Sequence, residues 1–273
     1  MRGRTLAALA AVVAFGVLAV GPAGAITNGT LDGTTHPEVG AMLADFGDGD
    51  GLQVVCTGTL ISPRVFLSAG HCTDYLSSVG IPPHDVWVTF DPHWDAATGT
   101  AYRGTYFTDP AYGYSGQGGS SDPHDLAVVV LDQAIAGITP AALPRTGVLD
   151  RLPLRSATFT PVGYGTVRDI KTTGPHAFSF DSTRRYATQS FRSLEKAWLN
   201  LSENPSTGSG GTCYGDSGGP HFYGGATSNQ LAATTITGDT ACRASDKDYR
   251  LDTASAASFL SGFAQYGPYT YWG

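Results

Sequence analysis

The sequence predicts an all-β protein. Short runs of β-branched and aromatic residues recur along the chain, separated by Gly, Pro, Asn and Asp. Many short strands at such spacing are typical of a barrel or a sandwich. The composition agrees, because 36 of the 273 residues are glycine and only 14% are charged. A turn-rich β structure therefore fits the chain better than a bundle of helices.

Seven runs are the clearest candidate strands. They span residues 52–60, 65–68, 86–90, 126–131, 157–162, 189–194 and 231–237. Helical periodicity is clear only near the C-terminus, where Ala256, Phe259, Leu260 and Phe263 fall on one face and Asp252 or Thr253 is the candidate cap. Residues 113–122 and 204–212 are rich in Gly and Ser and are predicted to be loops.

Residues 1–25 are predicted to be an export signal. Arg2 and Arg4 precede an apolar run over residues 6–20, and Ala23-Gly24-Ala25 is a small-residue cleavage site. The run is shorter than the roughly 20 residues that a membrane-spanning helix needs. We therefore expect a secreted, extracellular protein that begins at Ile26. The absence of a longer propeptide points to a bacterial source.

The charge balance excludes two classes of partner. Loss of Arg2 and Arg4 takes the formal net charge from −7 to −9, so the mature chain is acidic. An acidic surface with scattered charges does not favour nucleic acid or an anionic membrane. No cofactor and no metal are expected, because neither a Cys-x-x-Cys pair nor an acidic loop with calcium-ligand spacing is present.

The four cysteines suggest two disulfides in an oxidising compartment. Counting alone allows three connectivities. Local pairing of Cys56 with Cys72 and of Cys213 with Cys242 would close two short loops.

Ser217 is the candidate nucleophile, in the run Gly215-Asp216-Ser217-Gly218-Gly219-Pro220. A serine hydroxyl needs a base and oxyanion donors, and flanking glycines let the backbone approach a substrate carbonyl. The same pattern also fits a plain glycine-rich turn or a lipase-type elbow. In that elbow the histidine follows the serine, whereas here only His221, within the same turn, does so. Chain order therefore argues against an esterase.

His71 and Asp125 complete a candidate triad. His71 stands next to last in the stretch from Cys56 to Cys72, in Ser68-Ala69-Gly70-His71-Cys72, and Asp125 precedes the strand at 126–131. These segments and the Ser217 motif resemble the chymotrypsin/trypsin family of secreted serine peptidases (family S1). Asp122 and Asp132 are the nearby competitors of Asp125. The resemblance implies a base (His71), an orienting carboxylate (Asp125) and an oxyanion hole formed by the N–H groups of Gly215 and Ser217.

The resemblance covers nearly all of the chain after residue 25. It implies two six-stranded antiparallel β-barrels with a C-terminal α-helix, the site lying between the barrels. Residues 26–140 would form the N-terminal barrel and residues 150–273 the C-terminal barrel and helix, together one peptidase domain over 26–273. The Cys56–Cys72 and Cys213–Cys242 pairings match two of the family's bridges. Val162-Gly163-Tyr164-Gly165 is similar to a glycine-aromatic-glycine turn of the family, with tyrosine in place of tryptophan.

The new terminus is a further expectation. Ile26-Thr27-Asn28-Gly29 is similar to the Ile-Val-Gly-Gly start of active family members. There the terminal ammonium pairs with the aspartate before the nucleophile, so Ile26 and Asp216 are the candidate activation pair. Thr27 and Asn28 depart from the family's start.

The candidate substrate pocket contains Gly211, Thr212 and Gly238. Gly211 stands six residues before Ser217, where trypsin-like members carry an aspartate, so a preference for Arg or Lys before the scissile bond is not expected. The wall that is usually Ser-Trp-Gly is here Ile236-Thr237-Gly238. Arg243 and Lys247 lie near the far wall, either favouring acidic side chains or as solvated loop charges.

The sequence thus predicts a monomeric serine endopeptidase acting on proteins or peptides through an acyl-enzyme. The alternative is a catalytically silent protein of the same fold that acts by binding.

Overall fold

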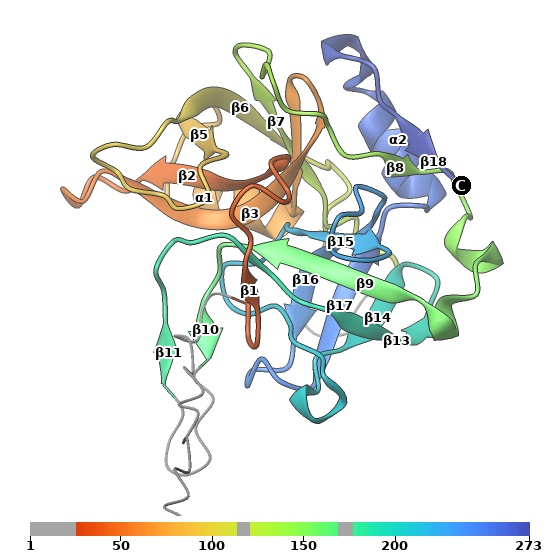
Figure 1. Ribbon diagram of the computed structural model, residues 1–273. Coiled ribbons are helices and arrows are strands. Elements are labelled where there is room, and N and C mark those ends of the chain that lie inside the picture. The colour runs from red at the N-terminus through yellow and green to blue at the C-terminus, as the bar shows by residue number, and fades with distance from the viewer. Residues whose placement is uncertain (1–25, 114–120, 169–176) are drawn as a thin grey trace, which may run out of the picture.

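The computed structural model describes residues 26–113, 121–168 and 177–273, so the export signal and most of the loop at 113–122 lie outside the described residues. Two closed antiparallel barrels pack against each other (Figure 1). Among the described residues, no helix has both the length and the apolar character that crossing a membrane requires.

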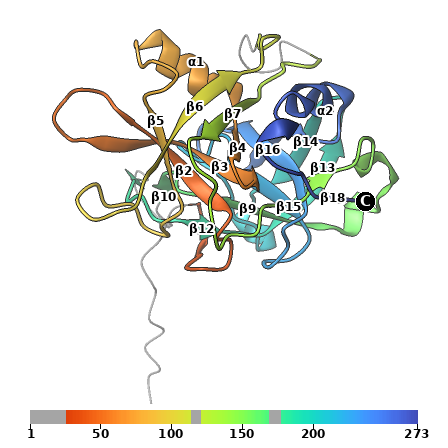
Figure 2. The ribbon, with the colours of Figure 1, turned by 90° about the horizontal axis from the view of Figure 1, so that it is seen from above.

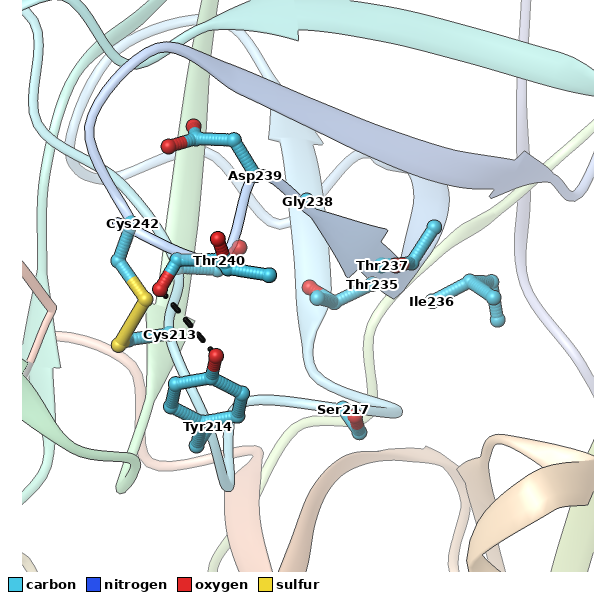
Figure 3. A pocket seen from close by; sticks show the side chains of 11 residues that line it. Cys213, Tyr214, Ser217, Thr235, Ile236, Thr237, Gly238, Asp239, Thr240 and Cys242 are labelled. Atoms are coloured by element: carbon cyan, nitrogen blue, oxygen red, sulfur yellow. Dashed lines mark hydrogen bonds between the residues drawn. A yellow bond between two sulfur atoms is a disulfide. The ribbon is translucent and has the colours of Figure 1, made fainter. Parts of the chain in front are cut away.

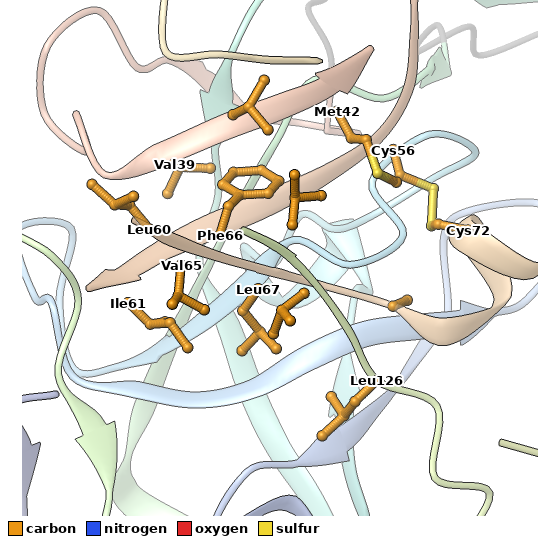
Figure 4. Packing of buried hydrophobic residues seen from close by; sticks show 14 of the residues in the cluster. Val39, Met42, Cys56, Leu60, Ile61, Val65, Phe66, Leu67, Cys72 and Leu126 are labelled. Carbon is orange, nitrogen blue, oxygen red and sulfur yellow. A yellow bond between two sulfur atoms is a disulfide. The ribbon is translucent and has the colours of Figure 1, made fainter. Parts of the chain in front are cut away.

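The first barrel has six strands in the order β2-β3-β4-β7-β6-β5. The strands are β2 (Val39–Asp45), β3 (Leu52–Ser62), β4 (Val65–Ser68), β5 (Val86–Thr89), β6 (Tyr102–Thr108) and β7 (Ala127–Leu131). The apolar side chains of β3, β4 and β7 fill its interior, with Leu60, Phe66 and Leu67 at most 1% exposed (Figure 4). A strand such as β7, in which every residue is buried, reads as a continuous apolar run rather than an alternating one.

The second barrel also has six strands. They are β9 (Thr158–Gly163), β13 (Gln189–Leu194), β14 (Trp198–Ser202), β15 (Pro220–Tyr223), β16 (Leu231–Gly238) and β17 (Ser245–Arg250). The barrel closes because β15 pairs antiparallel with β16 on one side and with β9 on the other.

Two helices and several short elements connect or cover the barrels. The α-helices are α1 (Gly70–Ser78) and α2 (Ala254–Ser261), and the 3₁₀ turns are η1 (Leu149–Arg151), η2 (Leu154–Ser156), η3 (Pro205–Thr207) and η4 (Ala264–Tyr266). The remaining strands are β1 (Thr30–Leu31), β8 (Leu143–Pro144), β10 (Val167–Arg168), β11 (Phe178–Ser179), β12 (Arg185–Tyr186) and β18 (Tyr271–Trp272). In Figure 2, α1 lies beside β6, where the Thr73 hydroxyl is 2.7 Å from that of Thr108.

The ends of the chain cross between the two barrels. Near the start, β1 pairs antiparallel with β12, which belongs to the sheet of the second barrel. After α2 the chain returns to the first barrel, where the rings of Phe107 and Phe263 lie 5.5 Å apart and Arg64 stacks over Tyr266. Each barrel is therefore covered in part by the other half of the sequence.

Each of the seven strands that the sequence predicts is present, with its ends shifted by no more than two residues. The terminal helix is present too, and Thr253 is its cap, accepting a hydrogen bond from the N–H of Ala256. The sequence reasoning missed α1, because its residues are mostly small and polar and give no helical periodicity. Both predicted disulfide pairings, Cys56–Cys72 and Cys213–Cys242, are present.

Candidate active site

His71 lies in the first turn of α1, directly after β4. The neighbouring Cys72 is bonded to Cys56 of β3, which ties the start of the helix to the first barrel (Figure 4). The side chain of His71 is 27% exposed, so the imidazole is anchored at its base and open to solvent at its edge.

Asp125 faces His71 from the segment that leads into β7. The preceding His124 has φ +51°, in the left-handed region that residues with a side chain seldom adopt. The carboxylate is fully buried and accepts from the backbone N–H of His71 at 2.8 Å and lies 3.0 Å from its Nδ1. A carboxylate in this position selects the imidazole tautomer with the proton on Nδ1.

The two competing aspartates lie elsewhere. Asp122 accepts hydrogen bonds from the hydroxyls of Tyr249 and Ser255, and Asp132 is exposed at the end of β7.

Ser217 belongs to the second barrel, and the first barrel holds its loop. The backbone N–H of Thr57 on β3 donates to the carbonyl of Ser217 at 3.0 Å, and the Thr57 hydroxyl donates to the carbonyl of Gly215 at 3.0 Å. The Sγ of Cys72 lies 3.9 Å from the same Ser217 carbonyl. The loop of Ser217 therefore meets the segment that carries His71.

Gly218 is the position where this contact demands glycine. Its φ is +80°, and a Cβ there would lie 2.1 Å from the Ser68 hydroxyl and 2.6 Å from the Thr57 carbonyl. A side chain at 218 would push the nucleophile loop away from the first barrel.

Two backbone N–H groups of the loop are left available. Within the described part of the chain, the N–H groups of Asp216, Gly218 and Gly219 donate to backbone carbonyls, whereas those of Gly215 and Ser217 donate to no protein acceptor. An arrangement of this kind can bind a developing oxyanion.

A cavity of about 170 Å³ opens next to Ser217 (Figure 3). Its wall is formed by β16 and by the loop tied by the Cys213–Cys242 disulfide, and the Tyr214 hydroxyl donates to the carbonyl of Thr240 at 3.2 Å. Four threonines contribute to the lining: Thr212, Thr235, Thr237 and Thr240.

The predicted pocket residues fall in two places. Thr212 and Gly238 line the cavity, whereas Gly211 is not among its lining residues and pairs with Thr27 through two backbone hydrogen bonds. Neither Arg243 nor Lys247 lines it. The Lys247 ammonium instead lies 4.5 Å from the ring centre of Trp198, on the outside of the barrel.

Glu203 is a residue of this region that the sequence reasoning missed. Its carboxyl group packs directly on Gly211, where a Cβ would lie 2.4 Å from Oε1, and it also accepts from the Thr212 hydroxyl at 3.3 Å. Burial, followed by the nearby Asp246 and Asp239, raises the pKa of Glu203 to about 10. A single acid at the end of a strand carries no signal that it lies beneath a pocket.

Asp216 is fully buried behind the nucleophile. Its carboxylate accepts from the N–H groups of Gly165 and Cys213, both at 2.8 Å. Burial raises the pKa of Asp216 to about 7, although the two backbone donors oppose the shift. Among the described residues no basic side chain forms an ion pair with it, and Ile26 is itself fully buried.

Three further groups of residues from the sequence analysis can be located. The cluster of His71 with Cys56 and Cys72 has metal-like spacing, but both sulfurs are used in the disulfide. Tyr164 is fully buried and donates to the carbonyl of Asp91 at 2.7 Å while accepting from Arg184 at 3.1 Å. His221 lies on β15 rather than in the turn after Ser217, and is fully buried.

Comparison with known proteins gives one result. A family model described as Trypsin matches residues 34–256, which is more than half of the chain. No curated protein matches the sequence.

Proposed function

The chain belongs to the trypsin family of serine endopeptidases, and from this we propose that it hydrolyses peptide bonds with Ser217 as nucleophile, His71 as base and Asp125 as orienting acid. The observation that carries the proposal is the buried Asp125 carboxylate, 3.0 Å from Nδ1 of a partly exposed His71, beside the loop of Ser217.

The catalytic roles follow from which nitrogen of His71 carries the proton. With Nδ1–H donating to Asp125, the unprotonated Nε2 takes the proton of Ser217 as its oxygen attacks the substrate carbonyl. The imidazolium then gives this proton to the leaving amine, and the acyl-enzyme remains. Water repeats the sequence, releases the acid and restores Ser217.

The oxyanion of each tetrahedral intermediate would be bound by the N–H groups of Gly215 and Ser217. Each such donor is worth about 3–4 kcal/mol in comparable sites. Their lack of an internal acceptor supports this role.

The mature terminus would complete the site. Cleavage before Ile26 would create an ammonium, and Asp216 is a buried carboxylate that has hydrogen-bond donors and lacks a charged partner among the described residues. Pairing of Ile26 with Asp216 would fix the loop that carries Ser217.

Specificity would favour uncharged side chains over Arg and Lys before the scissile bond. Supporting this, four threonines line the cavity next to Ser217, and the carboxyl groups of Glu203 and Asp246, which contact the Thr212 hydroxyl, are buried. Asp239 also lines the cavity, but its carboxylate accepts from the backbone N–H groups of residues 243–245. A cation entering the cavity would therefore lose hydration and compete with these donors for the lining carboxylate.

The setting fits an extracellular peptidase. The two disulfides favour an oxidising compartment, and we propose that the protein is secreted and acts as a monomer. We assign residues 26–140 and 150–273 to its two halves, within one peptidase domain.

An active-site phosphonate tests the proposal. Labelling at Ser217, abolished in Ser217→Ala and strongly slowed in His71→Ala, is the expected result. A folded protein that takes up no label would instead favour the binding-only alternative.

A further inference from the structure

The interior of the second barrel is polar next to the Ser217 cavity. His221 of β15 and Asp246 and Asp248 of β17 are at most 1% exposed. In the sheet, Asp248 is opposite Leu199 and Asp246 is opposite Leu201, two buried leucines of β14. Residues directly opposite each other share a face, so both aspartates point into the barrel.

The atoms without a hydrogen-bond partner in this interior are all side-chain oxygens. They are both carboxylate oxygens of Asp248, Oδ1 of Asp246, Oε2 of Glu203 and Oε1 of Gln189. Buried polar atoms in proteins nearly always have a partner. Five such oxygens at one place need protons, water or a cation among them.

The protein supplies little positive charge here. Within the described part of the chain, His221 is the basic side chain that pairs with these carboxyl groups, 3.0 Å from Asp246 and 3.3 Å from Asp248. Lys247 lies between the two aspartates in sequence, but its ammonium is on the opposite face over Trp198. Buried carboxylates without compensation are strongly unfavourable.

The two nitrogens of His221 are not equivalent. Nε2 forms a hydrogen bond with Oδ2 of Asp246 at 3.0 Å. Nδ1 is 3.3 Å from Oδ1 of Asp248, which has no hydrogen-bond partner, and its own hydrogen-bond contact is a long one, 3.5 Å to the Thr235 hydroxyl. A histidine that binds a metal usually donates its other N–H to a carboxylate, as Nε2 can here to Oδ2 of Asp246, and Oδ1 of Asp246 is the oxygen left for the ion.

We propose that His221, Asp246 and Asp248 bind a divalent cation inside the second barrel. One ligand atom from each of the three lies within 4.8 Å of the others, a spacing that a single ion can span. An imidazole nitrogen with carboxylate oxygens is a donor set for zinc or manganese rather than for magnesium.

The ion would act on the pocket through Thr212. The hydroxyl of Thr212 donates to Oδ2 of Asp246 at 2.8 Å, and Thr212 lines the cavity beside Ser217. Fixing Asp246 would therefore fix one wall of that cavity. The cation would also neutralise the carboxyl groups beneath the pocket.

The test uses Ser217→Ala protein, so that metal binding is measured without peptidase activity or self-cleavage. Metal content is determined by mass spectrometry on the protein as isolated. A second sample is unfolded with its disulfides intact and refolded with ZnCl₂, MnCl₂, CaCl₂ or EDTA, because a fully enclosed site exchanges ions only on opening. Asp248→Asn removes one ligand, and Asp50→Asn, an exposed aspartate in the β2–β3 turn, is the matched control.

We expect about one zinc or manganese ion per chain in the parent and in Asp50→Asn, and little in Asp248→Asn. EDTA should lower the unfolding midpoint of the parent by about 5–10 °C and leave that of Asp248→Asn unchanged. Absence of metal from both preparations, with the same midpoint in EDTA and in each metal, would overturn the proposal and leave protons to neutralise the cluster. Neither result depends on whether Ser217 is a nucleophile.

Discussion

The backbone N–H of Thr57 donates to the carbonyl of Ser217 at 3.0 Å, across the boundary between the two barrels. The Thr57 hydroxyl adds a bond to the carbonyl of Gly215 and accepts from the N–H of Tyr164 at 3.1 Å. One buried threonine of the first barrel thus holds two residues of the nucleophile loop and the turn behind it.

Thr57→Val should lower kcat by about 10-fold to 100-fold, because the Gly215 carbonyl loses its donor and the oxyanion groups lose their alignment. Thr160→Val is the control, since it removes a similar buried hydroxyl that donates to the carbonyl of Gly224, away from Ser217. Both variants should lose about 1–3 kcal/mol of unfolding free energy. Equal kcat values for the two variants would contradict a role for Thr57 in aligning the loop.

Asp125→Asn should reduce kcat by about 10⁴-fold with little change in fold, the loss that a wrong imidazole tautomer causes in this family. The neighbouring Asp122→Asn should keep kcat and instead lower stability, because Asp122 accepts hydrogen bonds from Tyr249 and Ser255. Steady-state kinetics and thermal unfolding of both variants separate the two roles. Similar kcat losses would show that Asp125 is not the orienting acid.

An extra residue before Ile26 should lower activity by at least about 10-fold, because the ammonium can no longer reach Asp216. The measurement compares the mature form with forms extended by one or two residues. Asp216→Asn in the mature form is the control and should be as impaired as the extended forms. Undiminished activity of the extended forms would rule out the activation pair.

The same comparison has a pH signature. In the extended form Asp216 has a folded pKa of about 7, above its ordinary value of 3.8, so the folded state binds the extra proton. Its contribution to stability is present below pH 3.8 and is lost as the pH rises to about 7. The mature form, with its ammonium paired to Asp216, should lack this loss, as denaturant unfolding at several pH values would show.

Arg184→Met should destabilise the protein by about 3–5 kcal/mol, because it leaves the buried Asp32 without its cation. The Arg184 guanidinium is 2.7 Å from Asp32 and donates to the carbonyls of Val39, Phe90 and Gly33. Adding Asp32→Asn should recover part of the loss. Additive losses in the double variant would show that the pair is not coupled.

Asp32 should also contribute to acid unfolding. Burial alone would raise its pKa, but the hydrogen bond with His36 and the charge of Arg184 outweigh burial and lower it. The stability that this gives is present above the ordinary value of 3.8 and is lost as the pH falls through the folded pKa. In Asp32→Asn, the unfolding free energy measured by denaturant titration should lack this part of its decline between neutral and acid pH.

Gly211→Ala should cost about 1–3 kcal/mol of stability, because its Cβ would overlap the Glu203 side chain. The cost should be smaller in a Glu203→Ala background. Gly225→Ala, where a Cβ meets nothing within 4 Å, is the control. If Gly211→Ala is as mild as the control, Glu203 does not fill this space. If Gly211→Ala is clearly more destabilising than the control, Glu203 does fill this space. A Gly211→Asp variant, made to test for trypsin-like specificity, would then need Glu203 replaced by a shorter side chain.

Much of the fold could be predicted from the sequence, because its strands are short apolar runs between glycines and prolines. The segments at 65–68 and 189–194 have the same bounds in sequence and structure. Helix α1 could not be predicted, because its sequence has no apolar periodicity. Its contacts with the barrel include polar ones, such as that of Thr73 with Thr108. The pairing of the chain start with the second barrel could not be predicted either, because β1 has only two residues and gives no strand pattern.

The candidate triad was accessible from the sequence because its three residues lie in local motifs. The position of Glu203 beneath the cavity was not, because its carboxyl group meets Gly211 from the residue that follows β14. Likewise, the alternation of Asp246 and Asp248 indicates a shared face but not that the face points inward. What brings such residues together is strand register, which one sequence does not reveal.

The crossed chain ends have a consequence for cleavage of the protein. The link between the barrels, residues 145–157, runs over the outside with Arg145 and Arg151 exposed. A cut there would divide the polypeptide into two fragments that stay associated. Tyr271 and Trp272 of the second fragment pair with Leu143 and Pro144 of the first. Residues 30–31 of the first fragment pair with 185–186 of the second. The nicked enzyme should remain a single particle, its two fragments parting only when it is unfolded.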